Sequence, residues 1–199
     1  MTIKSEAGPA DHPPAKDAKV RTRRRRWPWM LAAGAAALLI YNLTVWLPAA
    51  HALGQDGRNE VAGLHVYRSW LVHPRDITVD LVTLGEAAPI DLTRGLFQAA
   101  ESLKDREFGR VILARQGCPV FMMEGPAFQE LGQAYAGGEN PVYLLRTLPE
   151  QLYLPDGTAA YGTWTGGWLG VLGRQIEDVN AFGADWAAGE RDTARASDF

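Results

Sequence analysis

One apolar run dominates the pattern of hydrophobic and polar residues along this chain. It follows an arginine-rich segment at 21–26, and from Trp27 to Gln55 no residue is charged when His51 is neutral. As a helix that rises about 1.5 Å per residue, the stretch from Trp29 to Leu47 is long enough to cross a hydrocarbon core of about 30 Å. The pattern therefore predicts one transmembrane helix within residues 27–50.

The residues that flank this run predict its orientation. Arginines precede it and only mixed charge follows it, which by the positive-inside bias places the N-terminus in the cytoplasm. Trp27 and Trp29 at one end, with Tyr41 and Trp46 toward the other, are typical of aromatic side chains at membrane interfaces. We therefore expect residues 27–50 to contact lipid in the inner (cytoplasmic) membrane, with the C-terminal domain in the periplasm or outside the cell.

A cleavable signal peptide is the alternative to a retained anchor. The tripeptide Ala50-His51-Ala52 has the small-x-small form of a cleavage site, and Pro48 would end the apolar helix just before it. Against cleavage stand an apolar run of about 19 residues, where a signal core has about 7 to 15, and a long polar lead before it. The retained anchor is favoured, and release of a soluble periplasmic product after Ala52 stays open.

Beyond the anchor, apolar positions recur with the periods of strands and helices. Alternation from Asp76 to Leu84 predicts a strand, and two β-rich runs around Gln116-Gly117 predict a hairpin. Helical spacing predicts helices that begin after Asp91 as N-cap, at Gly125-Pro126, near 142–146 and near Gly167. The expected fold class is α+β, a small antiparallel sheet covered by helices and preceded by one transmembrane helix.

These patterns divide the chain into five parts. Residues 1–26 lack apolar periodicity and are expected to be disordered. The parts are a disordered basic cytoplasmic tail (1–26), a transmembrane signal-anchor helix (27–50), a juxtamembrane linker (51–63), an extracytoplasmic α+β domain (64–188) and a frayed C-terminal tail (189–199).

Charge and cysteine content narrow the classes of function. Residues 1–26 contain eight Lys/Arg and three Asp/Glu, a net charge of +5, whereas the remaining 12 basic and 20 acidic residues give −8. An acidic domain repels phosphate backbones, so we do not expect nucleic-acid binding. Cys118 is the only cysteine, which excludes an intramolecular disulfide and a cysteine-rich zinc site. No cofactor is predicted.

The segment from Tyr161 to Gly170 is the strongest candidate for a ligand site. Glycines before a helix leave backbone N–H groups free for an anion, hydroxyls add hydrogen bonds, and indole rings offer a stacking surface. It lacks the Lys-Ser/Thr pair of a P-loop. The alternative, which we favour, is that Thr165 caps the helix while the tryptophans and glycines serve packing. The candidate ligand-binding residues are Thr163, Trp164, Thr165, Gly166, Gly167 and Trp168.

Two histidines and the single cysteine are interpreted as structural or surface residues. His65 and His73 have no third ligand at metal-site spacing, so we expect neither a metal site nor catalysis from them. Cys118 beside a hairpin turn has no histidine downstream to serve as its base.

An acidic pair near the C-terminus is also assigned to the surface. Glu177 and Asp178 diverge by about 100° on a helix, which indicates a solvated face, and Arg174 is spaced to pair with Asp178.

The sequence thus favours a non-catalytic function. We expect a membrane-anchored protein whose extracytoplasmic domain is a binding or assembly module for a protein or envelope partner. The alternative is a small-ligand-binding or hydrolytic periplasmic domain that uses the loop 162–170.

Overall fold

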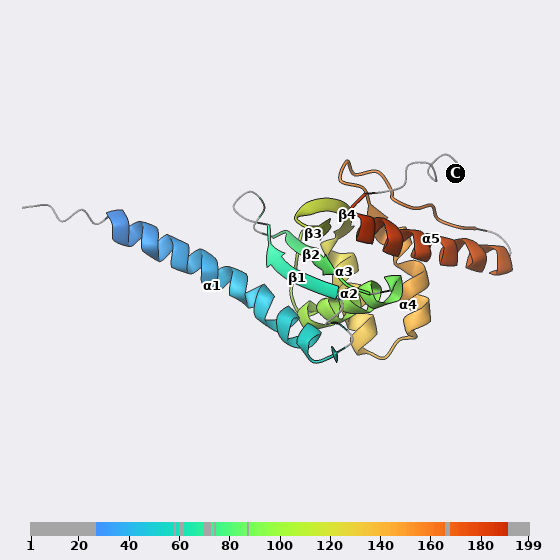
Figure 1. The fold of residues 1–199 in the computed structure, drawn as a ribbon, viewed down its shortest axis with the longest axis horizontal. Coiled ribbons are helices and arrows are strands. Elements are labelled where there is room, and N and C mark those ends of the chain that lie inside the picture. Colours follow the sequence, from blue (N-terminus) through green and yellow to red (C-terminus); the bar gives the residue numbers. More distant parts are fainter. Residues whose placement is uncertain are drawn as a thin grey trace, which may run out of the picture.

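The computed structural model describes residues 27–57, 59, 62–69, 73, 75–86, 88–165 and 168–190, and the predicted tail 1–26 lies outside them. These residues form five α-helices and one five-stranded sheet in the order β1-β2-β3-β4-β5, which confirms the α+β prediction (Figure 1). The helices are α1 (Trp27–Gly54), α2 (Pro89–Leu103), α3 (Gly125–Ala136), α4 (Pro141–Thr147) and α5 (Trp168–Ala188), with a 3-10 turn η2 (Pro149–Gln151). The strands are β1 (Ala62–Arg68), β2 (Ile77–Leu84), β3 (Arg110–Arg115), β4 (Cys118–Glu124) and β5 (Leu152–Tyr153).

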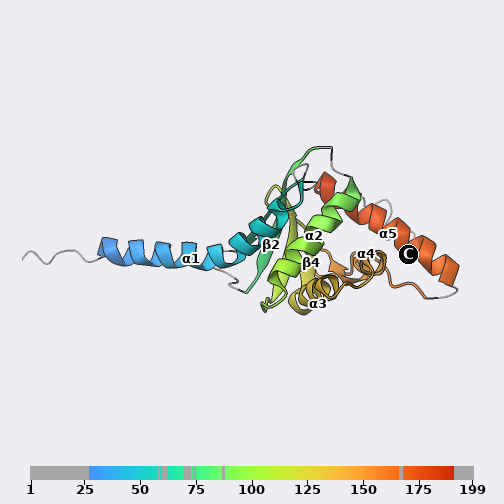
Figure 2. The same ribbon diagram turned by 90° about the horizontal axis from the view of Figure 1, so that it is seen from below.

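Helix α1 projects from one side of the domain, and only its C-terminal half contacts the rest of the molecule (Figures 1 and 2). Among the described residues it is the one helix long and apolar enough for a membrane anchor or a signal sequence. Its last turns pack on β1 and α2 through Val45, Ala49 and Leu53, all of them buried.

The linker between α1 and β1 is shorter than the expected range 51–63. Helix α1 continues to Gly54 and β1 starts at Ala62, so both ends of that region belong to regular elements. The reason is that Leu53 continues the apolar stripe of Val45 and Ala49, and burial of that stripe holds the helix together past Pro48.

The sheet is mixed, since three neighbouring pairs are antiparallel and β2 pairs with β3 in parallel. Helix α2 carries the chain from the end of β2 back to the start of β3, so the two strands run in the same direction. Two elements, the edge strands β1 and β5, were not predicted from the sequence. In β1, buried Leu64 and Val66 alternate with exposed His65. This two-residue period is the pattern of a strand, but it extends over only a few residues.

The core lies between the sheet and the helices. Ile77, Val79 and Leu81 of β2 are fully buried on the helix-covered face, where they meet apolar residues of α2 such as Leu96. The polar residues between them are nearly buried as well, because β2 is a central strand with neighbours on both sides. Alternation therefore predicted the strand correctly.

Helix α2 begins earlier than predicted. Its first residue is Pro89 and its N-cap is Ala88, so the prediction that Asp91 is the N-cap is wrong. The Asp91 carboxylate instead accepts a hydrogen bond from the Ala88 N–H at 3.0 Å, which satisfies a backbone donor at the helix start. Proline is favoured at the first helical position because its φ is already helical and its missing N–H has no intrahelical partner there.

The predicted hairpin and the predicted start of α3 are confirmed. Gln116 and Gly117 have φ of 51° and 81°, the conformation of a two-residue turn that matches strand twist. Helix α3 begins at Gly125 and ends before Gly137, as the Gly-Pro and Gly-Gly signals indicated.

Close packing of α3 on α2 depends on Gly132. A Cβ added there would overlap the carbonyl oxygen of Ala100, a backbone atom that cannot move aside easily. Gly173 in α5 is also helical and exposed, but a Cβ added there meets nothing within 4 Å.

We expect Gly132→Ala to lower the free energy of unfolding by about 1–3 kcal/mol, because the added methyl overpacks the α2–α3 contact. The matched control Gly173→Ala should be neutral or stabilising by up to about 1 kcal/mol, since alanine costs less backbone entropy than glycine in a helix. Thermal or urea unfolding of the detergent-solubilised chain measures both. Equal effects of the two substitutions would contradict the close contact.

Candidate functional site

An apolar groove runs between α2, α4 and α5. It consists of two adjoining hollows of about 310 Å³ and 150 Å³. Ile90 of α2 and Val142 and Leu145 of α4 line both hollows, so the two form one continuous depression. Further apolar walls come from Phe97, Tyr135 and Pro141 in the larger hollow, and from Leu172, Ile176 and Val179 in the smaller one. We call this surface the α2–α4–α5 groove.

Exposed apolar side chains gather at this groove. Outside α1, the large hydrophobic residues exposed on the described part of the chain are Ile90, Val142, Tyr143 and Ile176. Three of them line the groove, and Val142 is 63% exposed. Single exposed apolar residues are ordinary, whereas a group around a depression is typical of an interaction site.

Local sequence holds the walls of the groove in place. The Asn140 side chain accepts a hydrogen bond from the Val142 N–H at 2.9 Å and caps α4, with Pro141 in its first turn. On the opposite wall, Gly183 of α5 lies so close to Pro89 that an added Cβ would overlap the proline ring. The groove is therefore a preformed feature of the packed helices.

Two polar residues that line the larger hollow have partners within the protein. Arg94 forms an ion pair with Asp91 at 2.9 Å, and Gln98 donates a hydrogen bond to Asp56 at 3.2 Å. These groups do not converge on a common point as an acid, a base and a nucleophile would. The arrangement suits recognition of an apolar face more than bond making or breaking.

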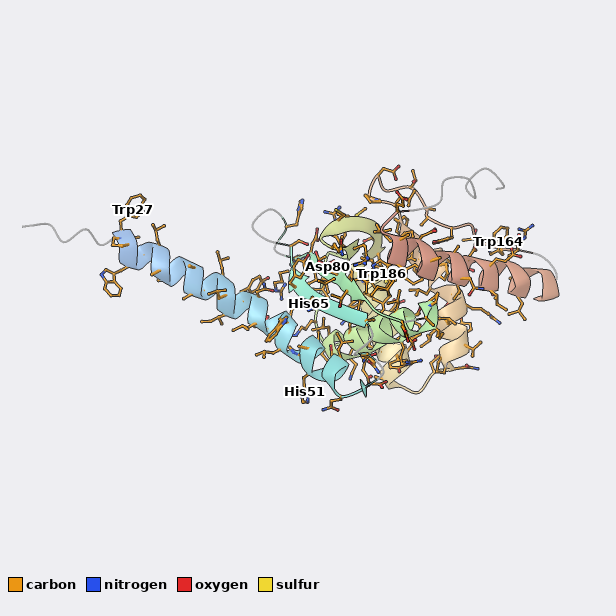
Figure 3. All side chains as sticks on the ribbon, viewed as in Figure 1. Trp27, His51, His65, Asp80, Trp164 and Trp186 are labelled. Atoms are coloured by element: carbon orange, nitrogen blue, oxygen red, sulfur yellow. The ribbon has the colours of Figure 1, made fainter. Side chains whose placement is uncertain are left out.

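The structure places Trp164, from the predicted ligand loop, against α5 (Figure 3). Its indole Nε1–H donates a hydrogen bond to Asp178 Oδ2 at 2.6 Å, and the Arg174 guanidinium lies 5.5 Å from its ring centroid. Trp164 is thus committed to packing in this conformation, while Thr163 and Thr165 are exposed.

Two residues of the predicted ligand loop, Gly166 and Gly167, lie outside the described residues. Helix α5 is described from Trp168 on, so the predicted cap by Thr165 stays a prediction.

Asp178 is buried, which corrects the expectation of a solvated face. Burial raises the pKa of its carboxyl, the Trp164 hydrogen bond lowers it in part, and the charges of Glu177 and Glu150 raise it further. Arg174 pairs with exposed Glu177 at 3.4 Å and not with Asp178 as predicted, because Asp178 turns toward Trp164.

The raised pKa of Asp178 predicts a pH-dependent contribution to stability. A carboxyl whose pKa is higher in the folded state stabilises the fold when protonated, and this contribution is lost as pH rises through the folded pKa. Between about pH 4 and pH 7 we therefore expect Asp178→Asn to lose less stability than the natural chain. The asparagine oxygen still accepts from the indole of Trp164.

Unfolding titrations at several pH values measure this difference. Glu139→Gln, the same neutralisation at an exposed carboxylate between α3 and α4 that does not contribute to the pKa of Asp178, should leave the pH profile unchanged. A profile for Asp178→Asn that parallels that of the natural chain would contradict the effect of burial.

A second buried carboxylate, Asp80, was not recognised as important from the sequence. Its Oδ2 accepts a hydrogen bond from the Tyr67 hydroxyl at 3.2 Å and its Oδ1 accepts from the Gly117 N–H at 3.0 Å. Burial and the neighbouring Asp80 charge raise the pKa of Tyr67 to about 12. Asp80 therefore links β1 to the β3–β4 hairpin, a structural task that occupies both carboxylate oxygens.

The histidines and the cysteine do not assemble into a centre in the described residues. His65 and His73 are exposed, and so is Cys118 at the hairpin. Within the same part of the chain, no three His, Cys, Asp or Glu side chains are placed to hold a metal ion. Figure 3 shows His51 and His65 on α1 and β1.

Comparison with known proteins adds no assignment, since no family model, curated protein or solved structure matches this chain. Helix α1 and the α2–α4–α5 groove are therefore the features that bear on function.

Proposed function

We propose that this is a single-span membrane-anchored protein whose extracytoplasmic domain is a non-catalytic binding module for another protein. The observation that carries the proposal is the continuous apolar groove between α2, α4 and α5. Grooves of this kind receive the apolar face of an amphipathic helix.

Packing of α1 supports retention of the anchor. The possible cleavage site Ala50-His51-Ala52 lies inside the helix, between two buried residues, Ala49 and Leu53. Cleavage after Ala52 would remove Val45 and Ala49 from the core and expose the apolar surface of β1 and α2 that they cover. Because residues of α1 complete the core of the domain, we expect α1 to stay attached and not to be cleaved.

Charge indicates what kind of helix fits. The chain after residue 26 has a net charge of −8, so a partner that flanks its apolar face with lysine or arginine is steered toward the domain. Under the positive-inside bias, the arginines before α1 support a position of the groove on the periplasmic or outer side of the inner membrane. The partner is then a membrane or envelope protein that is accessible on that side.

The alternative, a ligand-binding or hydrolytic domain that uses loop 162–170, has less support. Trp164 is held by Asp178, and the described loop residues bring no nucleophile and base together. No observation favours this loop over the groove as the binding surface.

Retention of the anchor predicts the mass of the mature protein. We expect a chain that still carries residues 27–52 in the membrane fraction, resistant to extraction with alkaline carbonate, because the apolar helix is held in lipid. Fractionation followed by intact-mass measurement tests this. A mature chain that begins at Leu53 and is recovered in the aqueous extract would overturn the anchored model.

Binding at the groove predicts site-specific crosslinking in cells. A photoreactive benzoylphenylalanine in place of Val142, which is 63% exposed, should form an adduct with another protein. The same residue in place of exposed Gln133 on α3, which does not line the groove, is the matched control. Gel analysis with mass spectrometry identifies the adduct.

A second change links the adduct to the groove. Ile176→Glu places a charge in the smaller hollow and should remove most of the adduct at residue 142, because an apolar face does not dock on a buried carboxylate. Adducts of equal yield at residues 142 and 133, or an adduct that Ile176→Glu leaves unchanged, would count against the groove as the binding site.

A further inference from the structure

The part of α1 that projects from the domain is shorter than a membrane span. It runs from Trp27 to Ile40, a length of about 21 Å at about 1.5 Å per residue. A hydrocarbon core of about 30 Å requires about 20 helical residues. From Trp27, a span of that length reaches Trp46, and tilting the helix only increases the number required.

The domain already contacts α1 within that span. The Asn42 Oδ1 accepts a hydrogen bond from the backbone N–H of Arg68 at 3.1 Å, and the Arg68 guanidinium lies 4.0 Å from the centroid of the Tyr41 ring. Beside this contact, Leu43, Trp46 and Leu47 remain exposed on α1. The apolar surface of the anchor therefore continues alongside the domain, which brings this end of the domain to the membrane boundary.

Two loops meet Arg68 at this end of the sheet. The Gly109 N–H donates a hydrogen bond to the Arg75 carbonyl oxygen at 3.0 Å, which ties the start of β2 to the start of β3. The Phe108 ring lies 5.7 Å from the Arg68 guanidinium. The described residues of these two loops, 68–69, 73, 75–76 and 104–110, thus form one surface, which we call the anchor-side end.

The anchor-side end is basic within an acidic domain. Its described residues include five basic and three acidic ones, a net charge of +2, while the whole chain after residue 26 carries −8. Arg110 forms an ion pair with buried Asp76 at 2.9 Å, whereas Arg75, Lys104 and Arg106 form no ion pair with any described residue. Burial lowers the pKa of Arg68, and the nearby charge of Arg106 lowers it further, so two cations lie close together.

We propose that the anchor-side end docks on the bilayer through anionic phospholipid headgroups, bound by Arg68, Arg75, Lys104 and Arg106. This inference rests on the proposed retention of α1 as an anchor. Phosphate oxygens at the membrane boundary complement the clustered guanidinium groups, which act as bidentate donors. The docked domain has a fixed height and tilt above the membrane.

Quenching of a site-specific fluorophore by lipids with a nitroxide in the headgroup tests this docking. The full chain is reconstituted into vesicles of phosphatidylcholine alone or mixed with phosphatidylglycerol. The natural Cys118, at the far end of the sheet, carries the fluorophore in the reference protein. In the second protein the fluorophore is attached to Asp105→Cys in a Cys118→Ser background, at an exposed position of the anchor-side end.

We expect strong quenching at residue 105 in vesicles with phosphatidylglycerol and little at residue 118. Quenching at residue 105 should fall by at least half with Arg75→Glu and Arg106→Glu together, and also at high salt, which screens surface charge. Arg174→Glu, an exposed charge reversal on α5, is the matched control and should leave it unchanged.

Two results would overturn the docking. One is quenching at residue 105 no greater than at residue 118. The other is quenching at residue 105 that persists in pure phosphatidylcholine and in the double variant. Carbonate extraction of the same vesicles is a separate readout, because release of the chain there refutes the anchor itself, whereas a retained but unquenched chain refutes only the docking.

Discussion

The packing of the last turns of α1 on β1 and α2 is the constraint on which the rest of the molecule depends. Val45, Ala49 and Leu53 belong to the same core as the sheet. The N-terminal half of α1 thus projects from the domain, whereas its last turns are part of the core. This joint brings the end of α1 into the domain core, so the expected linker 51–63 is reduced to the residues between Gly54 and Ala62. The direction of the helix and the orientation of the domain are therefore coupled.

Helix α2 connects this joint to the remaining elements through direct contacts. It contacts α1, α3, α5 and β1, and Gly95 leaves room for the side chains of Leu64 and Leu53 at the joint. Residues of α2 from Ile90 to Gln98 line the groove, and the C-terminus of α2 leads into the anchor-side end. Along α2 the two surfaces are thus separated by the last turns of the helix, about 9 Å at about 1.5 Å per residue. In the proposed docked state the groove therefore lies farther from the membrane than the anchor-side end.

Three buried carboxylates serve as structural links in this domain. Asp76 binds Arg110, Asp80 binds Tyr67 and the hairpin turn, and Asp178 binds Trp164. Each joins segments that are distant in the sequence, and the hydrogen bonds offset the cost of removing a charge from water. These groups are occupied within the fold, and the surfaces that we propose for binding are the apolar groove and the basic anchor-side end.

Local periodicity in the sequence was enough for the apolar helix, β2, the hairpin and the start of α3, because each depends on neighbouring residues and on turn chemistry at Gln116-Gly117 or Gly125-Pro126. Tertiary structure alone decided the rest. The parallel β2–β3 pair, the continuation of α1 into the core, the partner of Asp178 and the α2–α4–α5 groove all arise from contacts between segments far apart in the chain. The spacing of residues along one segment cannot encode which distant side chain will cover it, since that depends on how the layers pack.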